Sequence, residues 1–282
     1  MKTLVLGGSG FVGHYLMKYF DGIGTSSIER EGYTKLDITN REEITAVFQR
    51  EKPDLIINSA AMSDVDFCEK RREMAMRING ESVEWIARSA NIINSRFVQI
   101  STDYVFDGEK GDYREVDKPN PINAYGESKL IGEADALRHN SLVLRIEMPY
   151  GLNLAKNKNV FFESAVRNLR DGKIINAAID QIISPTFVED IPKAIYALIS
   201  KNRTGVFHLA SIEQLSRYEF VKKIAEVFGF DDKNVNATHL DDFKLVAKRP
   251  KKTSLNMGKI SSIFNVDTLE MNLKRIKKSY KI

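Results

Sequence analysis

The sequence predicts an α/β protein built on a doubly wound parallel sheet. Short apolar runs alternate with amphipathic segments of helical periodicity through residues 1–151. The runs are almost continuously apolar, which is typical of parallel strands buried on both faces. The first of them, residues 2–6, leads directly into a glycine turn and a helical pattern. Repeated strand–helix alternation of this kind predicts a Rossmann-like fold, with ligands gathered beyond the carboxyl ends of the strands.

The expected elements follow one another along the chain. Apolar runs predict strands at residues 2–6, 54–58, 97–100, 142–145, 173–175 and 206–210, and a further strand is expected near residues 23–26. Helical patterns are expected at residues 11–20, 41–50, 65–90, 125–133, 159–169, 188–199, 218–228 and 269–280. Residues 1–151 should form a nucleotide-binding domain, with 188–210 returning to it. Residues 152–187 and 211–282 should form a small α/β lobe that covers the substrate.

Composition excludes several classes of protein. The 282 residues hold 42 Lys and Arg against 38 Asp and Glu, and this weak excess gives no argument for nucleic acid. A single cysteine, Cys68, excludes an intrachain disulfide, and the four histidines show no metal-ligand spacing, so no metal site is expected. No apolar stretch approaches the roughly 20 residues of a membrane helix. We therefore expect a cytoplasmic protein that binds no membrane, and the sequence leaves open whether it forms a homodimer.

The glycine turn is the first candidate site. In Gly7-Gly8-Ser9-Gly10-Phe11-Val12-Gly13, the first glycine allows a tight turn, the middle one lets backbone amides approach a pyrophosphate, and the last lets the helix pack closely. An empty structural turn is the alternative, but the strand–turn–helix context favours a dinucleotide. The contacting residues are expected to be Gly7, Ser9, Gly10, Phe11, Val12 and Gly13.

The end of the second strand should select the cofactor. Hydroxyl groups and a nearby arginine, including Ser27 and Arg30, suit a 2′-phosphate, so NADPH is the expected cofactor. Glu29 on the ribose of NADH is the alternative. Asp37 and Ile38 should flank the adenine. The small residues Ala60 and Ala61 end a central strand, where they leave room for ribose and diphosphate or simply pack tightly.

The candidate chemistry lies between residues 101 and 133. Ser101 and Thr102 follow the apolar run 97–100, and Tyr125 and Lys129 stand four residues apart on one helix face. An ammonium group beside a phenol favours its anion, so the pKa of Tyr125 is expected to fall. Tyr125 would then protonate a carbonyl oxygen as hydride reaches its carbon. The Tyr-x-x-x-Lys pattern also occurs by chance, and its weight comes from the preceding strand.

These motifs resemble the extended short-chain dehydrogenase/reductase family and, within it, the dTDP-4-dehydrorhamnose reductases. The matching stretches are residues 7–13, 36–39, 52–54, 58–61, 101–108, 113–115, 125–133, 180–181, 184–186 and 249–250. The resemblance implies reduction of the 4-keto group of a dTDP-4-dehydro-6-deoxy sugar by NADPH, with NADH as the alternative cofactor. It implies catalysis by Thr102, Tyr125 and Lys129. Thr102 would bind the keto oxygen, Tyr125 would protonate it, and Lys129 would hold the nicotinamide ribose. Ser101, Tyr125 and Lys129 would contact the cofactor, and Asp103, Val105 and Met148 the sugar.

Two departures from that family's pattern bear on the substrate. Met148 stands where an aromatic Trp is common, which removes a flat face for the sugar, and Ile183 stands where glycine is usual. The regulatory (beta) subunit of methionine adenosyltransferase, which binds NADP, shares the Arg-Ile-x-x-x-Tyr-Gly stretch at residues 145–151. A non-catalytic subunit of that kind, and a reductase or epimerase acting on another sugar nucleotide, are therefore the alternatives.

Overall fold

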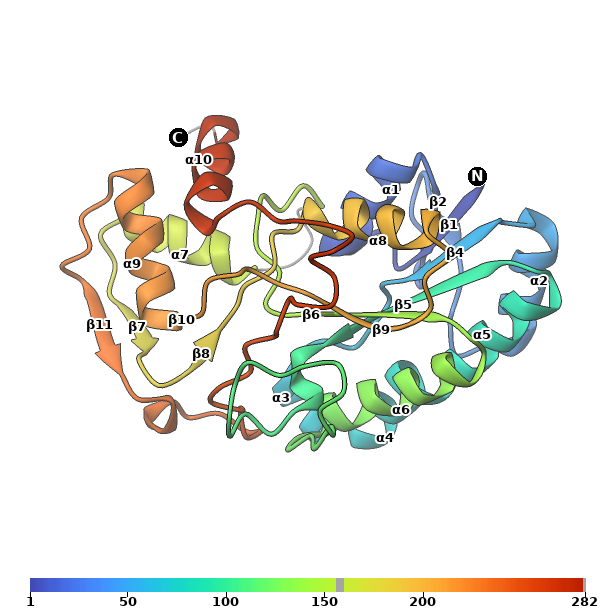
Figure 1. The fold of residues 1–282 in the computed structure, drawn as a ribbon, viewed down its shortest axis with the longest axis horizontal. Helices are drawn as coiled ribbons and strands as arrows, with labels where there is room; N and C mark the ends of the chain where they lie inside the picture. Colours follow the sequence, from blue (N-terminus) through green and yellow to red (C-terminus); the bar gives the residue numbers. More distant parts are fainter. Residues whose placement is uncertain (156–159, 281–282) are drawn as a thin grey trace.

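The computed structural model describes residues 1–155 and 160–280, and a seven-stranded parallel sheet runs through its larger part (Figure 1). The strand order is β3-β2-β1-β4-β5-β6-β9, and each strand is parallel to its neighbours. The strands are β1 (Thr3–Leu6), β2 (Ile23–Ser26), β3 (Thr34–Lys35), β4 (Leu55–Asn58), β5 (Arg96–Thr102), β6 (Leu142–Ile146) and β9 (Gly205–Leu209). The order reverses between β1 and β4, which creates the crevice in which such folds bind ligands. The predicted fold class is confirmed.

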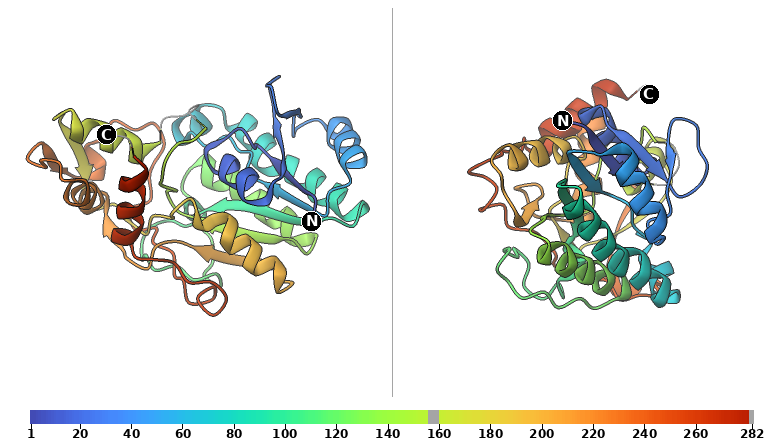
Figure 2. Two further views of the ribbon diagram at one scale, coloured as in Figure 1. Left: turned by 90° about the horizontal axis from the view of Figure 1, so that it is seen from above. Right: turned by 90° about the vertical axis from the view of Figure 1, so that its right-hand side faces the viewer.

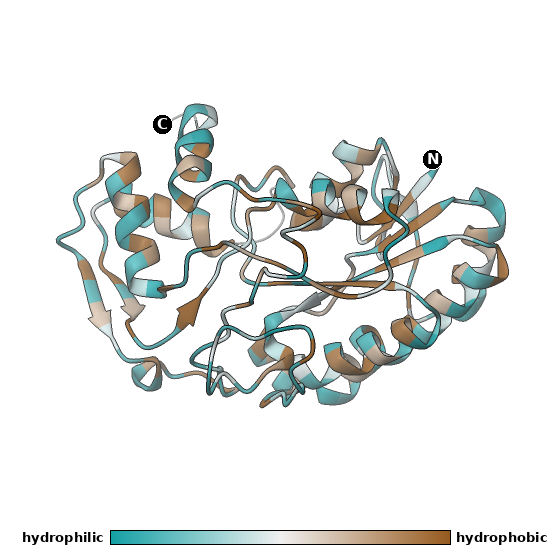
Figure 3. Cartoon of the chain, viewed as in Figure 1, coloured by the Kyte–Doolittle hydropathy of each residue, from teal (hydrophilic) through white to brown (hydrophobic). Residues whose placement is uncertain are grey.

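Helices cover both faces of this sheet. Consecutive strand residues point to opposite faces, so Val5 joins one hydrophobic layer and Leu4 the other. Figure 3 shows brown, hydrophobic stretches in the sheet, interrupted by paler and teal residues, and the helices likewise carry both brown and teal residues. One face is covered by α1 (Phe11–Phe20) and α8 (Asp190–Ser200), and the other by α2 (Arg41–Glu51), α5 (Ser82–Ile92) and α6 (Ala124–Arg138).

The helix expected at residues 65–90 is divided into several pieces. It consists of α3 (Val65–Lys70), α4 (Arg72–Ala75), a π-helical turn (Met76–Glu81) and the start of α5. Asn79 lies within the π-helical turn, accepts a hydrogen bond from the Met62 amide (2.8 Å) and donates one to the Met62 carbonyl (2.9 Å). One side chain thus fixes the backbone that follows β4, at the sheet edge where the site lies.

The remaining chain builds a smaller lobe, at the left of Figure 1 and separated along the long axis in Figure 2. It contains the parallel pair β7–β11 and the antiparallel pair β8–β10. Its elements are α7 (Phe161–Arg170), β7 (Ile175–Ala178), β8 (Ile182–Ile183), β10 (Leu215–Ser216), α9 (Arg217–Phe228), β11 (Val235–Thr238) and α10 (Leu269–Ser279). Two short 3₁₀ turns, η2 (Asp103–Val105) and η3 (Leu240–Asp242), complete the described elements. The domain limits at residues 151, 187 and 210 stay a prediction.

Within residues 1–155 and 160–280, no helix is both long and apolar enough to cross a bilayer.

Candidate active site

Two adjoining cavities open at the carboxyl ends of the central strands. The larger, about 400 Å³, lies between β5, β6 and α6 on one side and residues of the smaller lobe on the other. The second, about 300 Å³, lies between the glycine turn and the ends of β2 and β4. Gly10, Ser59 and Ala61 line both, so the two cavities join beside the glycine turn. An extended ligand can therefore occupy both.

The glycine turn has the shape that a dinucleotide phosphate requires. Gly7 has a φ of +72°, and a Cβ there would lie 2.7 Å from the Ala60 Cα. A Cβ on Gly13 would lie 2.1 Å from the Gly7 carbonyl oxygen, so α1 packs directly on the turn. Gly10 precedes α1 and provides no side-chain cap, which leaves the first-turn amides facing the cavity. The residues present fit the predicted cofactor.

The smaller cavity contains most of the residues that the sequence predicts to surround the adenosine part of the cofactor. Ser27, Asp37, Ile38, Ala60 and Ala61 line it, together with Ser9. The Asp37 carboxylate accepts hydrogen bonds from the Thr39 amide (2.9 Å) and hydroxyl (2.8 Å), so it is used within its own turn.

Arg30 does not join this group, because its side chain is exposed and lines neither cavity. The predicted second strand agrees with β2, which ends at Ser26. The loop after β2 then leads away from the cavity before it returns at β3. Of the two side chains chosen for a 2′-phosphate, only Ser27 lies at the site.

The larger cavity brings the predicted catalytic groups together. Ser101, Thr102, Tyr125 and Lys129 all line it, with Phe11, Val12 and Gly13 from the glycine motif. Thr102 ends β5, and Tyr125 and Lys129 lie in the first turns of α6. The Ser101 hydroxyl is 2% exposed and makes no hydrogen bond, so it is a polar group held ready for a ligand. The convergence of these residues follows from the parallel sheet, since β5 and α6 are consecutive elements.

A close contact between η2 and α6 sets the position of Tyr125. A Cβ on Gly126 would lie 2.1 Å from the Tyr104 carbonyl oxygen, so glycine is required for this approach. The Asn123 side chain caps α6 by accepting from the Gly126 amide (2.9 Å). The rings of Tyr104 and Tyr125 meet edge to face, with centroids 5.8 Å apart. The Tyr125 ring is thus held over the cavity from one side.

The expected fall in the pKa of Tyr125 is not found. Burial raises the pKa of Tyr125 above its ordinary value, and a hydrogen bond with Thr102 opposes this effect only in part. Lys129 is directed elsewhere, because its ammonium donates to the Ile100 carbonyl (2.7 Å). Burial also lowers the pKa of Lys129 to about 8. Spacing on a helix face could not reveal these competing effects, and a neutral Tyr125 remains able to donate a proton.

The predicted substrate residues are only partly brought together. Asp103 and Met148 line the larger cavity, and Met148 has a φ of +35°, an unusual backbone conformation for a side chain of this size. Val105 does not line it. Its side chain is fully buried against Phe106 and Leu255, because the η2 turn directs it beneath the cavity.

Sequence reasoning missed several lining residues, namely Glu147, Thr253 and Arg217. Glu147 directly precedes Met148 at the end of β6, so its position was a usable signal. Thr253 and Arg217 come from the smaller lobe, where irregular segments gave no pattern. The Arg217 guanidinium also stacks 4.8 Å from the Phe161 ring centroid.

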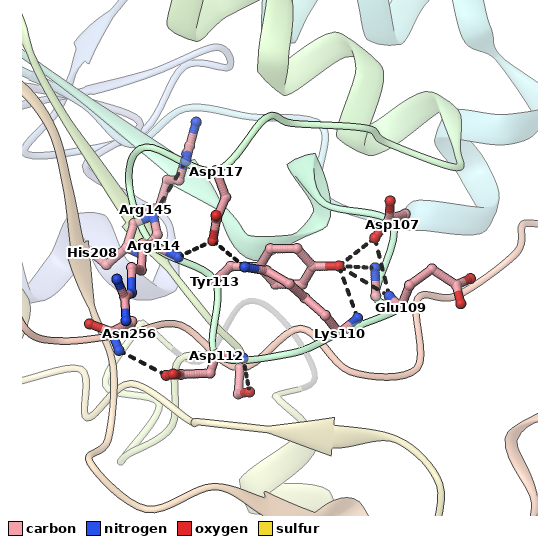
Figure 4. Close-up of polar contacts among 12 residues, drawn as sticks. Asp107, Glu109, Lys110, Asp112, Tyr113, Arg114, Asp117, Arg145, His208 and Asn256 are labelled. Carbon is pink, nitrogen blue, oxygen red and sulfur yellow. Dashed lines mark hydrogen bonds and ion pairs between the residues drawn. The ribbon is translucent and has the colours of Figure 1, made fainter.

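A compact loop behind the site ties the two parts of the molecule together (Figure 4). The Tyr113 hydroxyl accepts from the amides of Gly108 and Glu109 (both 3.1 Å) and donates to Asp107. Asn256 in turn donates to Asp112 (3.0 Å), and the Tyr113 amide bonds the Ser254 carbonyl (2.9 Å). This loop therefore anchors residues 253–256, which supply Thr253 to the cavity.

Comparison with known proteins places the chain in a family. Residues 1–281 match the model described as "RmlD substrate binding domain". A dTDP-4-dehydrorhamnose reductase of Aggregatibacter actinomycetemcomitans is 30% identical over 279 residues, or 94% of each chain. A methionine adenosyltransferase 2 subunit beta of Danio rerio is 30% identical over 92% of this chain and 84% of its own.

Solved structures agree with this placement. The dTDP-4-dehydrorhamnose reductase of Bacillus anthracis, solved in complex with NADP, superposes with a TM-score of 0.86 at 31% identity, covering 99% of this chain and 100% of its own. The relatives confirm the predicted enzyme class, that of the NAD(P)H-dependent oxidoreductases. The chain belongs to the RmlD substrate binding domain family, within the extended short-chain dehydrogenase/reductases that its motifs predict.

Proposed function

We propose that this protein reduces the 4-keto group of dTDP-4-dehydrorhamnose, a dTDP-4-dehydro-6-deoxy sugar, with NADPH, to form dTDP-L-rhamnose. The observation that carries the proposal is the convergence of Ser101, Thr102, Tyr125 and Lys129 on one cavity that continues into the glycine turn. Relatives named for this activity in Aggregatibacter and Bacillus support the choice of substrate.

The side chains have distinct roles in this proposal. NADPH, held by the glycine turn and Ser27, would supply the hydride. Tyr125 would give its proton to the keto oxygen, and its raised pKa keeps that proton on the phenol until it is needed. Thr102 would donate a hydrogen bond to the same oxygen. Lys129 and Ser101 would hold the nicotinamide ribose, using the ammonium group and the unpaired hydroxyl.

The deciding experiment is an NADPH oxidation assay with dTDP-4-dehydrorhamnose, generated from dTDP-glucose by the upstream enzymes. Sustained turnover supports the reductase, and parallel runs with NADH decide cofactor preference. A clear preference for NADH would contradict the assignment of Ser27 to a 2′-phosphate.

A second function has a specific observation in its favour. Met148 replaces the aromatic residue of the reductases, and a beta subunit of methionine adenosyltransferase covers most of the chain. Tight NADPH binding without turnover of the sugar, together with co-purification of a methionine adenosyltransferase, would establish the regulatory role instead. Turnover of a different sugar nucleotide would identify the third alternative.

Two glycine substitutions should separate cofactor binding from folding. A Cβ on Gly10 meets only the Gly7 carbonyl oxygen, at 3.2 Å, whereas one on Gly13 meets the same oxygen at 2.1 Å. Gly10→Ala should therefore leave the melting temperature nearly unchanged but weaken NADPH binding by at least about tenfold, since the methyl group occupies the path of the phosphates. Gly13→Ala should lower both the melting temperature and the affinity for NADPH. Calorimetry without ligand and fluorescence titration with NADPH measure the two effects. If Gly10→Ala bound NADPH as tightly as the wild type, the phosphates of NADPH would not bind at this turn.

A further inference from the structure

Two buried carboxyl groups face each other at the floor of the larger cavity. Asp103 is 3% exposed and Glu147 is fully buried, and both line the cavity. Thr102 and Ile146 are register partners on β5 and β6, so the residues that follow them, Asp103 and Glu147, lie next to each other. Thr253 donates to Glu147 (2.8 Å) and also lies next to Asp103. Asp103 accepts from the Thr102 hydroxyl (3.0 Å). Glu147, Thr253, Asp103 and Thr102 thus form one cluster of polar groups.

The two threonine hydroxyls beside these carboxyl groups have one hydrogen each to donate. Thr102 gives its hydrogen to Asp103, and Thr253 gives its own to Glu147. The single hydroxyl hydrogen of Thr253 cannot serve Glu147 and Asp103 at the same time. Asp103 is therefore left with the Thr102 hydroxyl as its side-chain donor, and a buried carboxyl group with so few donors favours its neutral, protonated form.

The surroundings favour this division of charge. Burial raises the pKa of Glu147, but hydrogen bonds from the Ser184 amide (2.9 Å) and hydroxyl (2.6 Å) and from Thr253, together with the positive charge of Arg217, oppose this rise. Asp103 has no such set of donors, and burial and the Glu147 carboxylate raise its pKa well above the ordinary value. Glu147 is accordingly the ionised partner.

Other titratable groups face the pair from the same cavity. They are Tyr104, Tyr125, Lys129 and Arg217. The two phenols are neutral, because burial raises both of their pKa values. None of these groups therefore places a second negative charge next to Asp103.

We propose that Asp103 acts as a neutral acid, kept protonated by the fixed carboxylate of Glu147, and that this neutrality allows Thr102 and Tyr125 to serve the substrate. An ionised Asp103 would bind the Thr102 hydrogen through a charge-assisted bond, which is roughly twice as strong as a neutral one. It would also place a negative charge beside the oxygen on which negative charge develops during hydride transfer. Glu147 is thus a positioning residue, because its carboxylate is taken up by Ser184 and Thr253 and affects the reaction through Asp103. The inference rests on the proposed reduction.

Infrared spectroscopy tests the charge state without any turnover. The wild-type protein at neutral pH should show the C=O stretch of a buried protonated carboxylic acid, and this band should disappear in Asp103→Asn. Absence of the band from the wild type, or its persistence in Asp103→Asn, overturns the proposal. Because no substrate is needed, this result stands even if the sugar assigned above is wrong.

The pH profile tests the consequence for catalysis. Glu147→Gln removes the negative charge that repels an ionised Asp103, so Asp103 should lose its proton at lower pH. The basic limb of the pH profile of kcat should therefore move to lower pH by at least about one unit. The double variant Asp103→Asn/Glu147→Gln should return the limb to its wild-type position, because Lys129, with a pKa of about 8, still sets a limit of its own. Glu109→Gln, at an exposed carboxylate, is the control. An unmoved limb in Glu147→Gln overturns the proposal, and should that variant fold poorly, the infrared comparison still decides.

Discussion

Tyr125→Phe is expected to lower kcat for the keto sugar by at least about a hundredfold, the usual contribution of a positioned proton donor. NADPH affinity should stay nearly unchanged, because the ring keeps its edge-to-face contact with Tyr104 at 5.8 Å and only the hydroxyl is lost. Single-turnover kinetics measure the first effect and fluorescence titration the second.

Tyr104→Phe is the matched control for this prediction. Tyr104 lines the same cavity, and the proposed reaction assigns no proton transfer to its hydroxyl. A neutral hydrogen bond is worth about 1 kcal/mol, so the rate should fall by less than about tenfold. If Tyr125→Phe behaved like Tyr104→Phe, the proton would come from another group.

Glu133→Ala is expected to lower the free energy of unfolding by about 3–5 kcal/mol, the cost of leaving a buried charge without its partner. Glu133 is 1% exposed and Arg145 is 3% exposed. The guanidinium donates two hydrogen bonds to the carboxylate, at 2.8 and 2.6 Å, and so joins α6 to β6. Alanine would leave Arg145 buried without this pairing. Chemical denaturation measures the change.

Two further variants check the physical reason. Glu84 pairs with Arg138 at 3.3 Å on the surface, so Glu84→Ala should cost less than about 1 kcal/mol. Replacing both buried charges, as in Glu133→Leu/Arg145→Met, should recover much of the stability lost in Glu133→Ala, since no unpaired charge remains. Equal losses in Glu133→Ala and Glu84→Ala would show that burial adds nothing to this pair.

Much of the fold could be predicted because its signals are local. Continuous apolar runs and intervening helical periods identify parallel strands and their crossovers, and the run at residues 54–58 predicts β4 (Leu55–Asn58) from such a signal alone. The division of the helix expected at 65–90 could not be read in the same way. A π-helical turn depends on what Asn79 bonds across the chain, here the backbone of Met62.

The candidate site shows the same contrast between local and distant causes. In a parallel sheet the strands end, and the helices that follow them begin, at the same edge. The predicted topology therefore also predicts that the candidate residues meet there, namely residues 7–13, 101–102, 125 and 129. Arg30 and Val105 do not line the cavities, because the loop after β2 and the η2 turn decide where their side chains point.

The sequence by itself determined the fold class, the glycine turn and the group formed by Thr102, Tyr125 and Lys129, since each depends on spacing along one or two elements. Only the tertiary structure decided the charges within that group. Burial raises the pKa of Tyr125 and lowers that of Lys129, and Glu147 meets Asp103 through Thr253, 106 residues further along the chain from Glu147. Protonation depends on the solvent and charge around a group, and these arise only when distant segments pack together.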